Sequence, residues 1–206
     1  MKKQIKNIVF DQGKVLLDFQ MDRVLNTFFR NDADRALVKA TVFASGDWES
    51  IDAGLLTEAQ ALEKWMTETP ARLHGAIRDM FEGWYGTMTP VPGMTELVRT
   101  LKQNGYRCYL LSNTAPNFYA HYLSVEVMRL LDGYIVSAVH RLYKPAPAIY
   151  QRLFDTYALD PEECFFVDDL PANVEAGQSL GMRGFVFANY DVNALKQALR
   201  AEGVEI

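Results

Sequence analysis

The chain has 206 residues, of which 49% are hydrophobic and 23% are charged, enough apolar material for one sizeable core. Its formal net charge is −5, and no run of Lys and Arg stands out. Binding to a nucleic-acid backbone rests on clustered basic side chains, so the composition argues against a nucleic-acid partner. An acidic protein can still hold a small phosphorylated molecule through a few local donors and a metal.

Two features bear on where the protein works. The basic start, MKKQIKNIVFDQG, has a short apolar run that ends at Asp11, too short for a secretory leader, and no stretch approaches the length of a membrane span. The two cysteines, Cys108 and Cys164, lie in strand-like runs and are expected to be small buried core residues. Neither has the neighbouring ligands that a metal site needs. We therefore expect a cytoplasmic protein without a membrane partner.

Five short apolar runs are typical of buried strands. They are near-continuous in Ile, Val, Phe, Tyr and Leu, as strands covered on both faces are. These runs occupy residues 5–11, 106–113, 132–138, 163–169 and 183–189.

Helical patterns lie between most of these runs. Pro92-Gly93 opens the pattern MTELVRTLKQ, and Asn104-Gly105 ends it. Two further helices are predicted over residues 145–157 and 171–180. Apolar strands that alternate with helices predict an α/β fold, in which right-handed crossovers join a parallel sheet covered on both sides.

The segment from about residue 20 to residue 88 breaks this alternation. It contains four helical patterns and no convincing strand: MDRVLNTFFR, RALVKATVFA, TEAQALEKWM and ARLHGAIRDMFEGWY. Because it lies between the first two strands, we expect a small all-helical domain, residues 19–88, inserted into a core formed by residues 1–18 and 89–206.

Polar side chains follow successive strands at the points where these strands end. Ligands of an open parallel sheet bind outside the carboxyl ends of its strands. One acid after a strand is usually a turn or capping residue, but convergence from several strands is hard to explain as structure alone. Carboxylates that meet repel one another unless a cation offsets them, and Mg²⁺ suits oxygen ligands of this kind. The residues on this rim are Asp11, Ser112, Asn113, Lys144, Asp168 and Asp169.

Four motifs make the pattern specific: FDQG, LLSN, the pair Lys144-Pro145, and FVDDLPANVEAG. Their order and spacing resemble those of the haloacid dehalogenase superfamily of hydrolases, over essentially the full chain. The resemblance implies a Rossmann-like three-layer core, and the helical insertion matches the position of the C1 cap in that family. The stretches DQGKVLLDFQMDRV and GDWESIDAGLLTEAQ further resemble a bacterial branch that includes α-D-glucose-1-phosphate phosphatases.

The resemblance implies that Asp11 is a nucleophile that attacks phosphorus and forms an aspartyl-phosphate, which water then hydrolyses. Mg²⁺ is expected between the Asp11 carboxylate, the backbone carbonyl of Gly13 and the acidic pair. Within that pair, Asp169 is the expected direct ligand and Asp168 its outer partner.

The remaining motif residues are expected to bind substrate. Ser112 and the backbone N–H of Asn113 would hold phosphate oxygens, and Lys144 would bind phosphate and balance charge. Asn173 either orients the acidic loop or has a plain role at the start of its helix. The expected substrate is a small phosphorylated metabolite, with a sugar phosphate as one candidate. The sequence does not indicate which oligomeric state the protein adopts.

Gly13 departs from the pattern of phosphatases in this superfamily. They usually carry a second aspartate there, two residues after the nucleophile, which protonates the leaving group and then activates water. Such catalysis contributes roughly 10²–10⁴-fold. One interpretation is a substrate whose leaving group needs little protonation, such as an oxygen on an anomeric carbon; the branch named above also has glycine here.

Two alternatives stay open. Loss of catalysis would leave a binding or regulatory protein. Lys14 either pairs with Asp11 and competes with Mg²⁺, which favours this alternative, or points away as a solvated side chain. A haloacid dehalogenase would need the nucleophile but no metal; that family lacks the acidic pair Asp168-Asp169, which disfavours this alternative. On the insertion, Trp48, Glu49 and Asp52 would either face the substrate or serve as a packing residue and two solvated acids.

Overall fold

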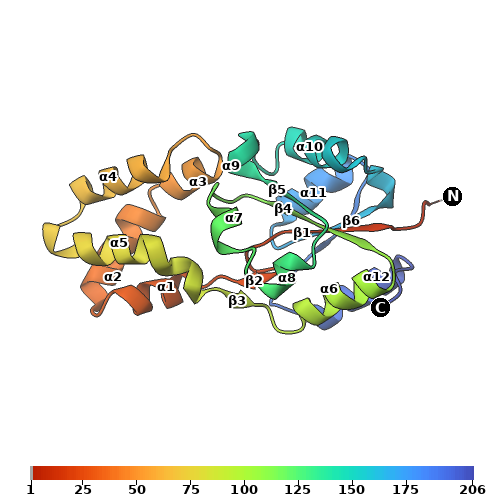
Figure 1. The fold of residues 1–206 in the computed structure, drawn as a ribbon, viewed down its shortest axis with the longest axis horizontal. Helices are drawn as coiled ribbons and strands as arrows, with labels where there is room; N and C mark the ends of the chain where they lie inside the picture. Colours follow the sequence, from red (N-terminus) through yellow and green to blue (C-terminus); the bar gives the residue numbers. More distant parts are fainter. Residues whose placement is uncertain (1) are drawn as a thin grey trace.

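The computed structural model describes residues 2–206. These residues form an α/β part around a five-stranded sheet and an all-helical part beside it (Figure 1). None of the helices in this range is long and apolar enough to cross a membrane.

The sheet is parallel throughout, with the strand order β5-β4-β1-β6-β7. Every strand predicted from the sequence is present, so the predicted α/β class is confirmed. The strands are β1 (Asn7–Phe10), β4 (Arg107–Ser112), β5 (Gly133–Val136), β6 (Cys164–Asp168) and β7 (Arg183–Val186).

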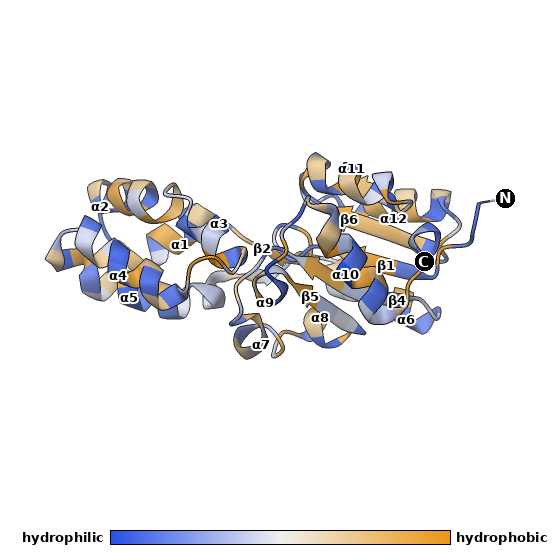
Figure 2. Cartoon of the chain, turned by 90° about the horizontal axis from the view of Figure 1, so that it is seen from above, coloured by the Kyte–Doolittle hydropathy of each residue, from blue (hydrophilic) through white to orange (hydrophobic). Residues whose placement is uncertain are grey.

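Strand β1 lies in the middle of the sheet and is buried along its whole length. Because successive side chains of a strand point to opposite faces, Ile8 and Phe10 pack into one apolar cluster and Val9 into another. Figure 2 shows the strands as mostly hydrophobic ribbons between the surrounding helices. The three layers of the Rossmann-like core follow from this alternation.

Two sets of helices cover the sheet (Figure 1). One face is covered by α6 (Met94–Gln103), α8 (Glu126–Arg129) and α12 (Val192–Ala201), and the other by α10 (Pro147–Tyr157) and α11 (Pro171–Ser179). Helix α6 begins after Gly93, whose φ is +85°, and buries Met94, Leu97, Val98 and Leu101. The apolar spacing thus selects the buried face of the helix.

The helical part has an apolar cluster of its own. At its centre is the fully buried Trp65, whose indole N–H donates to Asp47 over 2.8 Å. The elements are α1 (Met21–Phe28), α2 (Asp32–Val38), the π-helix η1 (Lys39–Phe43), α3 (Asp47–Asp52), α4 (Glu58–Glu68), the 3₁₀-helix η2 (Ala71–Leu73), α5 (His74–Gly83) and the 3₁₀-helix η3 (Trp84–Thr87).

A two-stranded antiparallel pair lies where the chain leaves and re-enters the α/β part. It consists of β2 (Leu17–Asp18) and β3 (Thr89–Pro90). The expected boundaries coincide with the end of β2, after residue 18, and the start of β3, before residue 89, and the division into two domains stays a prediction. The remaining short elements are α7 (Phe118–His121), α9 (Ser137–His140) and the 3₁₀-helix η4 (Pro161–Glu163).

Candidate active site

Three carboxylates meet at the carboxyl ends of β1 and β6. Asp11 directly follows β1, where its backbone N–H donates to Val167 over 2.9 Å. Asp168 is the last residue of β6, and Asp169 follows it. Each acid offers an oxygen, and these oxygens lie within 4.8 Å of one another. The structure therefore brings together all three acids that the sequence placed on one rim.

A buried lysine joins two of these acids. Lys144 Nζ donates to Asp11 Oδ1 over 2.7 Å and to Asp168 Oδ2 over 2.6 Å, and the side chain is 1% exposed. Asn113 holds the lysine backbone on both sides: its Nδ2 donates to the Lys144 carbonyl, and its Oδ1 accepts from the Lys144 N–H. The loops that follow β4 and β5 are thus fixed to each other.

The electrostatics of this cluster favour a further cation. Burial raises the pKa of Asp11, and Asp168 adds to the rise while Lys144 opposes it. Burial would lower the pKa of Lys144, but the two carboxylates hold it above its ordinary value, so the lysine stays charged. Burial and the charge of Asp168 raise the pKa of Asp169. One buried ammonium faces three carboxylates, and this oxygen donor set fits a hard divalent cation.

The two members of the acidic pair differ in their partners. Asp168 is fully buried, and both its oxygens are engaged: Oδ1 accepts from Leu170 N–H and Asn173 Nδ2, each over 2.9 Å, and Oδ2 accepts from Lys144. Asn173 therefore orients the acidic loop, one of the two roles that the sequence left open. Asp169 is only partly buried and lies beside Lys14.

Lys14 adopts the left-handed backbone conformation, with a φ of +58°. Its Nζ lies 3.7 Å from Asp169 Oδ2, and its side chain is 54% exposed. A pair between Lys14 and Asp11, considered from the sequence, is not among the ion pairs of residues 2–206. The ammonium instead sits at the outer edge of the acidic cluster.

A pocket of about 200 Å³ opens over the carboxylates. Ser112, the last residue of β4, lines this pocket together with Asn113 and Asp11. The predicted phosphate-binding residues thus share one space with the predicted nucleophile. Gly13, Lys144, Asp169 and Asn173 line it as well.

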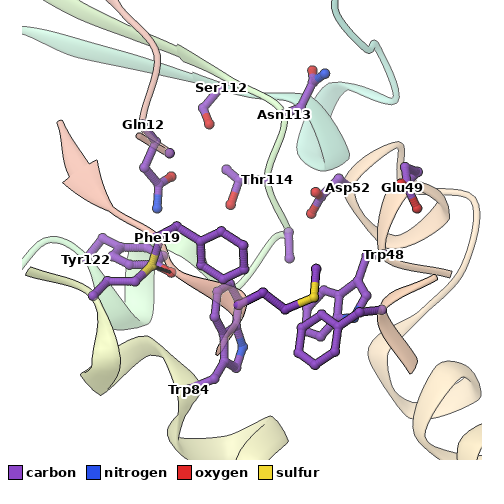
Figure 3. Close-up of a pocket in the computed structure, with 15 residues that line it drawn as sticks. Gln12, Phe19, Trp48, Glu49, Asp52, Trp84, Ser112, Asn113, Thr114 and Tyr122 are labelled. Atoms are coloured by element: carbon purple, nitrogen blue, oxygen red, sulfur yellow. Dashed lines mark hydrogen bonds between the residues drawn. The ribbon is translucent and has the colours of Figure 1, made fainter. Parts of the chain in front are cut away.

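A second pocket, of about 270 Å³, adjoins the first and shares Gly13, Phe19, Asp52, Ser112 and Asn113 with it. Figure 3 shows polar side chains at one end, among them Gln12, Thr114 and Asp52, and rings at the other, among them Phe19, Trp48 and Trp84. The sequence did not single out Gln12 or Thr114, although each directly neighbours a motif residue. The pocket thus has a polar end beside the motif residues and an aromatic end beside the helical part.

The three residues singled out on the insertion all line this second pocket. Trp48 also packs against other rings, with its centroid 5.6 Å from that of Phe43 and 5.2 Å from that of Trp84. It therefore packs and lines the pocket at once, whereas Glu49 lies exposed at its edge. Asp52 lines both pockets.

Residues 5–181 match the model of the haloacid dehalogenase-like hydrolase family. The chain belongs to this family. Among curated members of known function, it is 29% identical over 196 residues to a D-ribitol-5-phosphate phosphatase from Bacteroides thetaiotaomicron, covering 88% of this chain and 91% of the relative. It is 28% identical over 183 residues to a sesquiterpene phosphatase from Aspergillus oryzae, covering 87% of this chain and 88% of the relative.

Solved structures of haloacid dehalogenase family proteins share the fold. An enzyme from Bacteroides thetaiotaomicron, in complex with magnesium and inorganic phosphate, superimposes with a TM-score of 0.71 at 22% identity, covering 93% of this chain and 98% of the other. An L-2-haloacid dehalogenase from Xanthobacter autotrophicus gives 0.67 at 20% identity, covering 96% of this chain and 83% of the other. At these identities the likeness concerns the fold.

The predicted superfamily is therefore confirmed, and the family membership together with the phosphatase relatives confirms the prediction of a phosphatase-type hydrolase. The branch that includes α-D-glucose-1-phosphate phosphatases and the roles of the individual site residues stay predictions.

Proposed function

We propose that the protein is a cytoplasmic, Mg²⁺-dependent phosphomonoesterase that hydrolyses a small phosphorylated metabolite through an aspartyl-phosphate on Asp11. The observation that carries this proposal is the meeting of Asp11, Asp168, Asp169 and Lys144 at one end of the sheet, beside a pocket lined by Ser112. A buried carboxylate at the floor of a pocket, next to a cation and a hydroxyl, suits attack on a phosphate ester.

The proposed metal ligands are Asp11, the Gly13 carbonyl and Asp169, with Asp168 as their outer partner. The partners of the acidic pair support this division. Both oxygens of Asp168 already accept hydrogen bonds, whereas within residues 2–206 the Asp169 side chain has an ion pair with Lys14 at 3.7 Å and no hydrogen bond. Bound Mg²⁺ would offset the negative charge of the phosphoryl group.

The nucleophile is proposed to work as follows. Lys144 holds the Asp11 carboxylate through Oδ1 and reduces its repulsion of an incoming phosphate. A carboxylate oxygen of Asp11 then forms a bond to phosphorus while the bond from phosphorus to the ester oxygen breaks. Water subsequently cleaves the aspartyl-phosphate, which releases phosphate and restores Asp11.

The phosphate would be held by Ser112 and Asn113. The Ser112 hydroxyl and the Asn113 backbone N–H are proposed to donate to phosphate oxygens, an arrangement that stabilises charge most in a site shielded from water. The body of the substrate would occupy the second pocket, whose lining includes the rings of Trp48 and Trp84. A sugar ring fits this description, which keeps a sugar phosphate as a candidate.

The test replaces the proposed nucleophile. Asp11→Asn keeps the size of the side chain but should abolish Mg²⁺-dependent release of phosphate from 4-nitrophenyl phosphate, on the order of the 10⁶-fold loss seen when a hydrolase loses its nucleophile. Asp79→Asn, which removes an exposed carboxylate from α5, is the matched control and should keep full activity. An Asp11→Asn variant with wild-type turnover would show that Asp11 is not the nucleophile.

Two other functions predict different results. A binding or regulatory protein, favoured by the ion pair between Lys14 and Asp169, should hydrolyse no phosphate ester even in excess Mg²⁺. A dehalogenase should release chloride from 2-chloropropionate in the presence of a chelator. The cluster of three acids argues against the dehalogenase, because a metal-free reaction has no use for it.

A further inference from the structure

The loop after β1 has glycine, Gly13, at the position where phosphatases of this superfamily usually carry the aspartate that protonates the leaving group. At Gly13, an added Cβ would meet no atom within 4 Å, so the position is open space rather than a packed backbone turn. An ester oxygen that leaves phosphorus as an alkoxide needs a proton, and general acids typically supply roughly 10²–10⁴-fold in rate. Another group in the pocket must take this role if ordinary alcohols are to leave.

One carboxyl group from the helical part reaches the pocket. Asp52, at the end of α3, lines the pocket over Asp11 as well as the adjoining aromatic pocket. Figure 3 shows its carboxyl pointing into the space beside Thr114 and Asn113. It therefore stands where the two pockets join, between the proposed phosphate site and the proposed place of the substrate body.

The carboxyl of Asp52 is free to act. Among residues 2–206, no hydrogen bond or ion pair involves its side chain. Asp47 on the same helix shows the contrast, since its oxygens accept from Lys64 and from Trp65, each over 2.8 Å. Asp47 is tied to its own part of the molecule, whereas Asp52 is available to a bound molecule.

The backbone around Asp52 is anchored to the α/β part. Ser137 Oγ, at the start of α9, donates to the Asp52 carbonyl. Two residues on, Gly54 has a φ of +70°, and a Cβ there would lie 2.6 Å from the Ala138 carbonyl oxygen. Only glycine fits so close to α9, so this contact fixes the end of α3 over the site.

We propose that Asp52 is the general acid and base of the reaction, in place of the aspartate that Gly13 lacks. This inference rests on the proposed phosphatase function. In the first step, Asp11 forms its bond to phosphorus while the neutral Asp52 carboxyl gives its proton to the departing ester oxygen. In the second step, the Asp52 carboxylate takes a proton from the attacking water. Aspartyl-phosphate is then cleaved to Asp11 and phosphate, and Asp52 regains its proton.

The surroundings of Asp52 favour its neutral, protonated form. Burial raises its pKa to about 8, and the negative charges of Glu49, Asp11 and Glu58 act in the same direction. Tyr122 and Tyr143 also face it. A pKa near the working pH lets one group both give and take a proton, as this reaction requires.

The test compares two esters under single-turnover conditions with Mg²⁺. 4-Nitrophenyl phosphate has a good leaving group and benzyl phosphate a poor one. Asp52→Asn should slow the release of benzyl alcohol by about 10²–10⁴-fold and the release of 4-nitrophenol far less. Asp79→Asn is the control and should slow neither. Equal slowing of both esters by Asp52→Asn would assign Asp52 to binding, and no slowing would remove it from the reaction; either result overturns the inference.

A second variant tests whether the lost function of Asp52 is proton transfer to the leaving group. Because a side chain at position 13 has open space, Gly13→Asp in the Asp52→Asn background should recover much of the rate with benzyl phosphate. The thermal midpoint of Asp52→Asn, compared with that of the wild type, checks that the variant is folded. If the wild type hydrolyses neither ester, the proposed function fails together with the inference. If Asp11→Asn abolishes turnover and Asp52→Asn leaves both rates unchanged, only the inference fails.

Discussion

The Lys14 ammonium lies 3.7 Å from the Asp169 carboxylate, at the edge of the proposed magnesium site. A bound cation would compete with this lysine, so Lys14→Gln should strengthen Mg²⁺ binding. Exposed ion pairs contribute about 0–1 kcal/mol, which limits the expected fall in Kd to about fivefold. Isothermal titration calorimetry with MgCl₂ measures the change directly.

Lys39→Gln is the matched control for this prediction. Lys39 forms a similar ion pair, 3.6 Å from Asp22, with a side chain that is 55% exposed. It lies in the helical part, and its loss should leave the Mg²⁺ affinity unchanged. Equal affinities for the wild type and Lys14→Gln would mean that the lysine does not compete with the metal.

Lys144→Met should destabilise the protein strongly in the presence of a chelator. The substitution leaves Asp11 and Asp168 buried without their ammonium, and breaking a buried ion pair in this way costs about 3–5 kcal/mol. Urea unfolding measures the loss. Lys6→Met, which removes an exposed pair with Glu163, should cost only about 0–1 kcal/mol. A similar loss in both variants would refute the importance of burial.

Asp52→Asn should change how stability depends on pH. The pKa of Asp52 in the folded protein, about 8, lies above its ordinary value, so the folded state binds this proton more tightly than the unfolded state does. The resulting stability is fully present below the ordinary carboxyl pKa of about 4 and is lost as pH rises toward 8. With chelator present, thermal midpoints of Asp52→Asn should therefore improve relative to the wild type between pH 4 and pH 9.

The charged groups around Asp52 do not reverse the direction of its pKa shift, since Glu49, Asp11 and Glu58 are acidic and raise its pKa as well. Asp47→Asn gives the opposite comparison on the same helix. Although burial opposes the change, hydrogen bonds from Lys64 and Trp65 lower the pKa of Asp47. Its stabilising effect is present above the ordinary carboxyl pKa, so Asp47→Asn should weaken the protein at neutral pH. A rise in stability there would contradict this account.

Gly54→Ala should both destabilise the protein and slow turnover. Its φ of +70° imposes about 1–2 kcal/mol on any side chain, and the Cβ would in addition collide with the Ala138 carbonyl. Gly46→Ala is the control at the other end of α3, because its φ of +82° imposes the same strain but its Cβ has open space. The free energy of unfolding, measured in urea, and kcat should both fall further for Gly54→Ala than for Gly46→Ala. Equal effects would show that the contact with α9 has no function.

Much of the fold could be predicted because its signals are local. Strand β1 is readable as an apolar run, and α6 has both its starting glycine and its stop in the sequence. The rim of acids could be predicted for the same reason, since parallel strands bring the residues at their ends to one edge. Helices α7, α8 and α9 have four residues each, and β2 and β3 have two, too few to show a period.

The surroundings of single side chains could not be predicted in this way. Asp52 meets Ser137 from 85 residues away, through a contact between two parts of the molecule that no local pattern encodes. Lys14 presented the same difficulty. Its closeness in sequence to Asp11 suggested Asp11 as its ion-pair partner, whereas the structure pairs it with Asp169. Helix α12, by contrast, has a local signal in the sequence, because Leu195 and Leu199 are four residues apart and lie on one face of the helix.

The central place of β1 has a consequence for how the chain matures during synthesis. Asn7 pairs with Arg107 in β4 on one side and with Cys164 in β6 on the other. Strand β1 can therefore pair on both sides only after most of the chain has been translated. Contacts between such distant residues also slow folding, because long loops must close first. The strand that precedes Asp11 is synthesised early but gains its second neighbour late, and a nascent chain that has not reached β6 cannot assemble the acidic cluster.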